Sequence, residues 1–316
     1  MPAPQRIPLR GTGVALVKVL VLGSDTPLGH ALGAMLERLG RHEVTALTRA
    51  ACRWKSERQA KKAVVRTRSD IVVDLRISAA SDGGDPLQDI DVKRCHWVAK
   101  ASQRSAMTYL YVSTSRVFSG QLDRPYKEED TPDNATAAGD LLARAEQVVQ
   151  DSCEQHLILR LGPVFSFEGT NLITQMLGEL GHEGGSLVMD NNLRGCPVAA
   201  GDGARVISAL LDQLGTGMQA SGIYHYCSSD SATYYEFAEA LLASASQFSQ
   251  FSPDAVQLER QPEGLAPLNR ALECARIRNT FAIKQAPWRS AIPGIVKQYY
   301  LEQKQQQKPA LKQQQS

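Results

Sequence analysis

Residues 17–32 read VKVLVLGSDTPLGHAL, and this stretch decides the fold. The apolar run from Val17 to Leu22 predicts a buried parallel strand, and Gly23 and Gly29 enclose a turn that leads into a helix. Such a turn brings the N–H groups and the partial positive charge of a helix N-terminus up to a pyrophosphate. The stretch therefore predicts a dinucleotide-binding turn, with an ordinary strand-to-helix turn as the alternative.

The middle of this turn departs from the usual G-x-x-G-x-x-G spacing, because Thr26 stands where a second glycine is typical. A β-branched residue disfavours positive φ and adds bulk beside the phosphates, although its hydroxyl can contact them. We therefore expect a weakened cofactor site. The candidate cofactor-binding residues of the turn are Gly23, Asp25, Thr26, Leu28 and Gly29.

A basic segment after the second predicted strand, EVTALTR, indicates which cofactor binds. Arg49 ends that strand, where an acidic residue would hold the ribose of NAD. From residue 49 to residue 68 there are eight Lys or Arg and one Glu. Arg49 and Arg53 predict a pocket for the 2′-phosphate of NADP, whereas a solvated basic helix accounts for the more distant charges. Nucleic-acid binding is not expected, since Trp54 is the only aromatic residue among these charges.

Strand and helix signals alternate along the chain, which predicts an α/β fold with a doubly wound parallel sheet, a Rossmann domain. The other expected strands of this sheet are EVTALTR, DIVVDL, MTYLYVST and HLILRLG. From about residue 163, frequent glycines, short strands such as SLVMD and GIYHYC, and helices such as AGDGARVISALLDQL predict a smaller C-terminal α/β substrate lobe. The expected division is a flexible leader at 1–16, a Rossmann domain at 17–162, a substrate lobe mainly at 163–302 with some segments returning to the Rossmann domain, and a disordered tail at 303–316.

Composition narrows the function. The 316 residues are 43% hydrophobic and 22% charged, with a net charge of +2, which is typical of a globular protein and argues against coating nucleic acid. Six scattered cysteines without a C-x-x-C pair predict no zinc site and no disulfide framework, and they favour a reducing cytoplasm. No run is long enough to span a membrane, so no membrane partner is expected. The spacing of the cysteines gives no reason to expect a bound metal.

Seven motifs in chain order carry a resemblance to a known family. They are KVLVLGSDTPLG, YVSTSRVFSG, PYKEEDTP, EQHLILRLGPVF, VMDNNLRGCPVAAGDGARVI, GIYHYCSSDSATYYEFAEAL and PLNRALECARI. Together they resemble the dTDP-4-dehydrorhamnose reductase family of extended short-chain dehydrogenase/reductases, over about residues 17–300. The resemblance implies an NADP-binding Rossmann domain, a small lobe that holds a nucleotide sugar, and a homodimer. Regulatory relatives include the β subunit of methionine adenosyltransferase, so binding without sugar reduction has a precedent.

The resemblance also implies where catalysis would occur. A Tyr from a Y-x-x-x-K pair protonates the developing alkoxide, and the Lys lowers the pKa of the Tyr and holds the nicotinamide ribose. Counting back without gaps from EQHLILR and Glu146 puts the Tyr position at Ala138 and the Lys position at Leu142. The helix expected at 138–155 keeps its apolar face but lacks both catalytic groups, which indicates a degenerate member.

The family pattern S-T-D-Y-V-F is only partly retained. Ser113 and Thr114 remain, and Thr114 is predicted to hydrogen-bond the substrate carbonyl, whereas Ser115 and Arg116 replace the Asp and Tyr. Tyr126, in PYKEE, is the candidate for a displaced proton donor. A structural loop anchor is the alternative for this residue.

The second lobe keeps more of the family pattern. Asp190 and Asn192 match its D-x-x-x-G-x-P-T segment, and Asn269 matches its R-P-x-N-S-x-L segment. In that last segment Arg270 replaces Ser, and Ala266 replaces the Arg expected to bind the diphosphate. The resemblance therefore predicts an altered nucleotide-sugar pocket that includes Asp190, Asn192, Asn269 and Arg270.

Three functions follow. The first is a nucleotide-sugar and NADP-binding protein with lost or much reduced reductase activity. The second is an active NADPH-dependent reductase of a dTDP-4-keto sugar with a displaced proton donor. The third is a regulatory subunit that binds a protein partner, with Ala138 and Leu142 contributing to an apolar groove.

Overall fold

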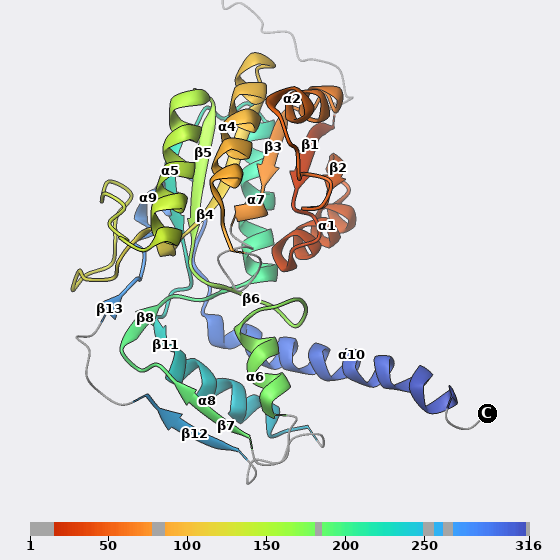
Figure 1. The fold of residues 1–316 in the computed structure, drawn as a ribbon, viewed down its shortest axis with the longest axis vertical. Helices are drawn as coiled ribbons and strands as arrows, with labels where there is room; N and C mark the ends of the chain where they lie inside the picture. Colours follow the sequence, from red (N-terminus) through yellow and green to blue (C-terminus); the bar gives the residue numbers. More distant parts are fainter. Residues whose placement is uncertain (1–15, 78–85, 181–184, 249–255, 262–267, 314–316) are drawn as a thin grey trace, which may run out of the picture.

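Two lobes make up the molecule, a Rossmann domain and a smaller C-terminal lobe (Figure 1). The computed structural model describes residues 16–77, 86–180, 185–248, 256–261 and 268–313. The leader predicted at 1–16 lies outside the described residues, apart from Leu16. Within the described chain, no helix combines the length and the apolar character that crossing a bilayer requires.

A six-stranded parallel sheet forms the centre of the Rossmann domain. Its strands follow the order β10-β5-β4-β3-β1-β2. Their bounds are β1 Val17–Leu22, β2 His42–Leu47, β3 Ile71–Asp74, β4 Thr108–Thr114, β5 His156–Leu161 and β10 Gly222–Tyr226. The apolar runs of β1, β3, β4 and β5 are buried because helices cover both faces of the sheet. The predicted doubly wound α/β fold is confirmed.

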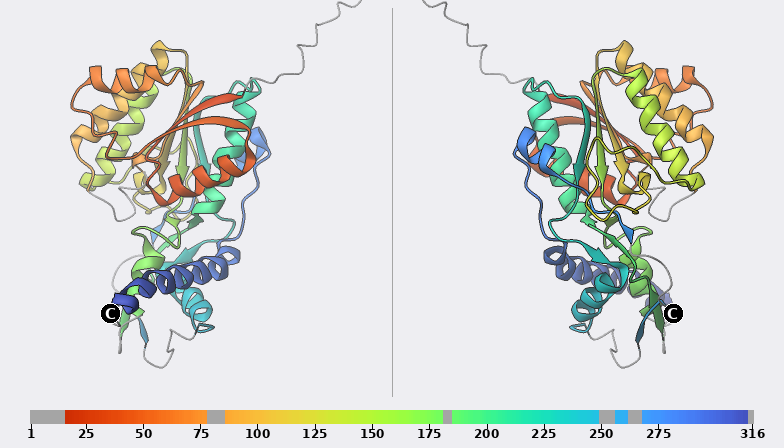
Figure 2. Two further views of the ribbon diagram at one scale, coloured as in Figure 1. Left: turned by 90° about the vertical axis from the view of Figure 1, so that its right-hand side faces the viewer. Right: turned by 90° about the vertical axis from the view of Figure 1, so that its left-hand side faces the viewer.

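Helices cover the two faces of this sheet unequally (Figure 2). On one face α1 packs against α7, and on the other α4 lies between α2 and α5. Their bounds are α1 Pro27–Leu39, α2 Glu57–Arg66, α4 Asp89–Arg104, α5 Ala137–Ser152 and α7 Ala200–Gly215. Helix α5 ends three residues earlier than predicted, because Cys153 adopts an extended backbone. Every third or fourth residue of α5 from Leu142 to Val149 is buried, which fixes this helix on the sheet.

Two segments that we assigned to the second lobe belong instead to the Rossmann domain. Strand β10, from the GIYHYC motif, pairs in parallel with β5 and extends the main sheet. Helix α7 packs against α1, and its residues Val206, Ile207 and Leu210 are buried. Their hydrophobic periodicity was readable in the sequence, but a pattern alone does not say which sheet it covers. Helix α9, Ala275–Phe281, also returns to this domain and contacts β10.

The smaller lobe has its own hydrophobic core. Phe165, Ile173, Phe237, Leu241 and Trp288 are among its buried members. Its elements are β6 Val164–Phe165, α6 Leu172–Leu180, β7 Ser186–Met189, β8 Leu193–Gly195, β9 Val198–Ala199, β11 Ala232–Thr233, α8 Tyr234–Ala245, β12 Gln257–Arg260, β13 Leu268–Asn269, η3 Trp288–Ala291 and α10 Ile292–Gln313. The short η1 helix, Ser115–Val117, follows β4 and faces this lobe.

Helix α10 differs from the prediction of a disordered tail from residue 303. It begins at Ile292, packs against α8, and then extends beyond the body of the lobe to Gln313 (Figures 1 and 2). The Gln, Lys, Leu and Ala residues of this segment are strong helix formers, so the low-complexity composition is compatible with a helix.

Candidate functional site

The glycine-rich turn after β1 is sterically constrained at both ends. Gly23 adopts φ +84°, which only glycine adopts readily, and it lies against the backbone of Leu75 and Arg76. A β-carbon on Gly29 would collide with the carbonyl oxygen of Gly23. The two glycines therefore allow helix α1 to begin directly beside the end of β1.

Thr26 is not strained at the middle position of this turn. Its φ is −88°, so the positive φ that we expected the position to require is not needed. The hydroxyl is also unavailable to a phosphate, because it donates to the Gly23 carbonyl at 2.9 Å and accepts from the Gly29 N–H at 2.9 Å. Thr26 thus acts as the N-cap of α1. The Leu28 N–H makes no hydrogen bond within the described chain and is the donor left at this helix terminus.

Asp25 and Arg49 connect the turn to the basic segment. The Asp25 carboxylate accepts the Arg49 backbone N–H at 2.6 Å and its Nε–H at 3.3 Å. Partial burial raises the pKa of Asp25, but the hydrogen bonds with Arg49 outweigh burial and leave this pKa below its usual value. Arg49 is thereby held beside the glycine turn.

A cavity of about 450 Å³ opens next to Arg49. Four guanidinium groups line it, those of Arg49, Arg53, Arg76 and Arg94. Three of them have carboxylate partners, since Arg76 binds Asp74 at 2.6 Å, Arg94 binds Asp91 at 2.8 Å and Arg49 binds Asp25 at 3.3 Å. The structure therefore brings both arginines predicted for the 2′-phosphate, Arg49 and Arg53, into one cationic cavity beside the turn.

Ala138 and Leu142 both lie on α5 but do not form an open surface. Leu142 is 1% exposed and belongs to the main core, while Ala138 is half-buried in the first turn of the helix. Neither residue lines the cavity beside Arg49 or the cavity between the two lobes. The apolar groove that the third function would take from this pair is not formed by Leu142, because its side chain is buried in the main core.

Ser113 and Thr114, at the end of β4, have structural partners. The Ser113 hydroxyl donates to Glu146 of α5 at 2.5 Å, and Glu146 also forms a buried ion pair with Arg160 of β5. Thr114 is 2% exposed, and its hydroxyl accepts the Arg116 N–H at 3.3 Å as the N-cap of η1. The end of β4 is therefore fixed to both α5 and η1.

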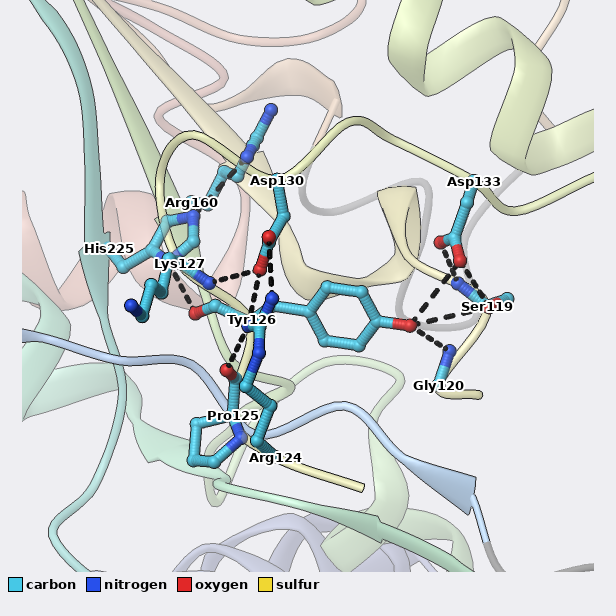
Figure 3. A network of polar contacts seen from close by, with 10 residues as sticks. All are labelled: Ser119, Gly120, Arg124, Pro125, Tyr126, Lys127, Asp130, Asp133, Arg160 and His225. Atoms are coloured by element: carbon cyan, nitrogen blue, oxygen red, sulfur yellow. Dashed lines mark hydrogen bonds and ion pairs between the residues drawn. The ribbon is translucent and has the colours of Figure 1, made fainter. Parts of the chain in front are cut away.

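Tyr126 is anchored within its loop (Figure 3). Its ring stacks on Phe118 at 4.0 Å between centroids, and its hydroxyl accepts the Gly120 N–H at 3.0 Å beside Ser119 and Asp133. The side chain is buried and does not line the cavity that lies between the two lobes. This geometry matches a loop anchor, because the hydroxyl contacts Ser119, Gly120 and Asp133.

A second cavity, of about 240 Å³, lies between the lobes. We call it the inter-lobe cavity. Its polar side chains come from both lobes, with Arg116 from η1, Arg194 from β8, Arg270 after β13 and Tyr234 at the start of α8. Its apolar side is formed by Pro163, Val164, Phe165, Leu172, Pro197, Ala232 and Phe237. The cavity lining thus combines three arginines with apolar side chains, which suits an anionic ligand with an uncharged part.

Of the four predicted substrate residues, Arg270 lines this cavity and three do not. The Asp190 carboxylate accepts the Asn192 N–H at 2.6 Å and orders the turn between β7 and β8. The Asn269 side chain accepts the Ala271 N–H at 3.0 Å. These three residues shape the loops, and the cavity is lined by their neighbours.

Sequence reasoning missed three cavity residues. Arg116 was visible as a replacement within the S-T-S-R-V-F motif, but nothing in the sequence placed its side chain between the lobes. Nothing in the sequence distinguished Arg194 and Tyr234 from the other arginines and tyrosines of the chain. Only the packing of the second lobe brings them together.

Comparisons with known proteins agree with this architecture. Residues 17–301 match the family described as the RmlD substrate binding domain. The spore coat polysaccharide biosynthesis protein SpsK of Bacillus subtilis (strain 168) is 28% identical over 231 residues, which are 72% of this chain and 79% of that protein. The dTDP-4-dehydrorhamnose reductase of Aggregatibacter actinomycetemcomitans is 24% identical over 290 residues, 89% of this chain and 98% of the relative.

Solved structures show the same fold. The dTDP-4-dehydrorhamnose reductase of Bacillus anthracis str. Ames, in complex with NADP, superposes with a TM-score of 0.74 at 19% identity, covering 90% of this chain and 99% of that one. MlghC, the GDP-mannoheptose C4 reductase of Campylobacter jejuni with NADP bound, gives a TM-score of 0.70 at 11% identity over 92% and 99% of the two chains. Because the family match spans nearly the whole chain, this protein belongs to the RmlD substrate binding domain family, the family of the dTDP-4-dehydrorhamnose reductases.

Proposed function

We propose that this protein binds NADP and a nucleotide sugar but reduces the sugar slowly or not at all. The proposal is carried by Ala138 and the buried Leu142, which stand at the positions predicted for the family's Tyr and Lys. The six cysteines, all free and buried, support a location in a reducing cytoplasm. A protein partner or a homodimer stays a prediction from the family resemblance.

The residues around the turn fit NADP. Gly23 and Gly29 allow a close approach to the start of α1, where the Leu28 N–H is directed outward from the helix terminus. Arg49 and Arg53 line the adjacent cationic cavity and suit a 2′-phosphate. NADPH would supply a hydride in this family, and the residues of this chain would bind and orient it.

The proton donor of the family reaction is the missing part. Loss of a general acid slows such a reaction by roughly 10²- to 10⁴-fold, and loss of the Lys removes cofactor orientation as well. The two retained hydroxyls do not compensate, because Thr114 caps η1 and Tyr126 is anchored in its loop. The residues of this chain therefore support ligand binding more strongly than reduction of the sugar.

One observation favours an active reductase as the second candidate. Tyr234 lines the inter-lobe cavity and is close enough to Arg270 to interact with it electrostatically. A guanidinium beside a phenol stabilises the phenolate, which is the effect that the Lys has on the Tyr in the family pair. In an active reductase, Tyr234 would be the displaced proton donor.

A ligand titration tests the binding proposal. Thermal unfolding would be followed with NADPH, NADH and several dTDP- and UDP-sugars, for the wild type, Arg49→Gln and Arg58→Gln. A ligand at 100 times its Kd stabilises the folded state by roughly 2.7 kcal/mol. We expect stabilisation by NADPH, a smaller effect in Arg49→Gln, and no change in Arg58→Gln, whose exposed side chain does not line the cavity. Absence of stabilisation by every ligand would contradict the proposal.

A further inference from the structure

Two arginines from distant parts of the sequence face the same enclosed space. Arg116 follows β4 on η1, and Arg270 follows β13 in the C-terminal region. Both line the inter-lobe cavity, and among its described lining residues none is an aspartate or a glutamate. The cavity therefore gathers positive charge without a carboxylate in its wall.

The third arginine of the cavity is already neutralised. Arg194 binds Glu236 at 2.7 Å and also donates to Ser231. By contrast, Arg270 donates through Nε to the Ser119 carbonyl at 3.3 Å, and the guanidinium of Arg116 has no hydrogen-bond or ion-pair partner within the described chain. The net charge that the wall presents comes from Arg116 and Arg270.

The two charges also disfavour each other. Burial and then the positive charge of Arg116 lower the pKa of Arg270 below its ordinary value. Two like charges in a partly desolvated space raise the free energy of the ligand-free protein. Such a pair is stabilised when an anion binds between them.

We propose that Arg116 and Arg270 together hold the diphosphate of the ligand. This inference rests on the proposed function and names the residues of that site. Two guanidinium groups match the charge of about −2 on a diphosphate diester, whereas a single carboxylate would leave one cation uncompensated. The family's arginine for this group is absent, since residue 266 is Ala, and neither position 116 nor position 270 carries Arg in the family motifs.

The position of Arg116 also determines where in the cavity the diphosphate lies. Its backbone N–H donates to the Thr114 hydroxyl at 3.3 Å, so this cation is only two residues from the residue predicted to meet the substrate carbonyl. A diphosphate held there lies on the β4 side of the cavity. The apolar wall of Phe165, Leu172 and Phe237 is then left for the uncharged part of the ligand.

Binding of simple anions tests this inference without any turnover. Affinities for pyrophosphate, dTDP, thymidine and glucuronate would be measured by calorimetry with the wild type, Arg116→Gln, Arg270→Gln and the double variant. Arg278→Gln is the matched control, because its exposed side chain lies on α9 outside the cavity. We expect each cavity variant to weaken pyrophosphate and dTDP binding by about 10- to 100-fold, the size of a charged hydrogen bond.

Further readouts make the outcomes decisive. The ligand-free Arg116→Gln and Arg270→Gln proteins should unfold at the same temperature as the wild type or higher, because a repulsion between two positive charges is removed.

Unchanged pyrophosphate affinity in the double variant, or tighter binding of glucuronate than of pyrophosphate, would overturn the inference. If nucleotide sugars keep wild-type affinity in the double variant, the proposed function stands and this inference fails. If pyrophosphate binding depends on both arginines but no nucleotide sugar or NADPH binds, the proposed function fails instead.

Discussion

Glu146 of α5 and Arg160 of β5 form an ion pair with an N···O distance of 2.6 Å, in which each side chain is 1% exposed. Two nitrogens of Arg160 reach the carboxylate, and Ser113 donates a further hydrogen bond to it. The pair fixes α5 against the ends of β4 and β5. It therefore holds in place the helix that carries Ala138 and Leu142, the positions predicted for the family's Tyr and Lys.

Glu146→Gln should destabilise the protein by about 3–5 kcal/mol, because it leaves the Arg160 charge buried without its partner. Urea unfolding monitored by circular dichroism measures this change. Arg144→Gln is the control on the same helix, since its pairs with Asp89 and Asp140 are exposed and such pairs contribute less than about 1 kcal/mol. Equal effects of the two substitutions would contradict the structural role of the buried pair.

Leu142→Lys, which restores one family residue, should destabilise the protein by more than about 2 kcal/mol, because a charged group enters the core. Leu142→Met is the volume-matched control and should change the free energy of unfolding by less than about 1.5 kcal/mol. If Leu142→Lys is as stable as Leu142→Met, the side chain at this position reaches the cleft and the core assignment is wrong.

Gly29→Ala should weaken NADPH binding and lower the melting temperature, because its β-carbon would collide with the Gly23 carbonyl oxygen. Gly33→Ala, four residues later in the same helix, meets nothing within 4 Å and should be neutral or stabilising by up to about 1 kcal/mol. Thermal unfolding with and without NADPH measures both effects. Similar behaviour of the two variants would show that the turn does not need its close contact.

His225 should make the protein less stable in mild acid. Burial, followed by the charge of Arg160, lowers the pKa of His225 to about 3. A neutral ring explains both contacts, since Nδ1–H donates to the Tyr126 carbonyl and Nε2 accepts from Arg160. The folded pKa lies below the unfolded value of about 6.5, so the unfolded state binds the extra proton and stability falls as pH drops from about 6.5 towards 3.

The free energy of unfolding, measured in urea between pH 4.5 and 7, checks this prediction. The His225 contribution has a slope of up to about 1.4 kcal/mol per pH unit, and His225→Gln should remove it. His30→Gln is the control, because His30 is half-exposed beside Glu168 and should keep the slope. An unchanged slope in His225→Gln would mean that other groups cause the acid sensitivity.

Local patterns predicted the Rossmann domain well. The bounds of β1 follow from hydrophobic periodicity, which acts over a few residues. The position of α7 and β10 required knowledge of which sheet they cover, and that depends on contacts between distant segments. Thr26 was misjudged because its own side chain supplies the cap that makes the turn regular.

The two cavities of the candidate site also differ in how far the sequence predicted them. Arg49 and Arg53 lie close together in the sequence and follow a strand, so their shared cavity could be predicted. The inter-lobe cavity takes Arg116, Tyr234 and Arg270 from three separate elements, and no spacing in the sequence connects them. Counting back from Glu146 predicts that Ala138 and Leu142 stand at the Tyr and Lys positions, but the burial of Leu142 needed the packed structure.

NADPH oxidation in the presence of a dTDP-4-keto-6-deoxy sugar tests the central claim most directly. The assay would use wild-type protein and Tyr234→Phe, at NADPH concentrations shown to saturate binding. We expect NADPH to bind and its oxidation to stay at least about 10²-fold below the 1–10³ per second of ordinary enzymes. Steady turnover within that ordinary range would contradict the account, and its loss in Tyr234→Phe would identify the displaced proton donor.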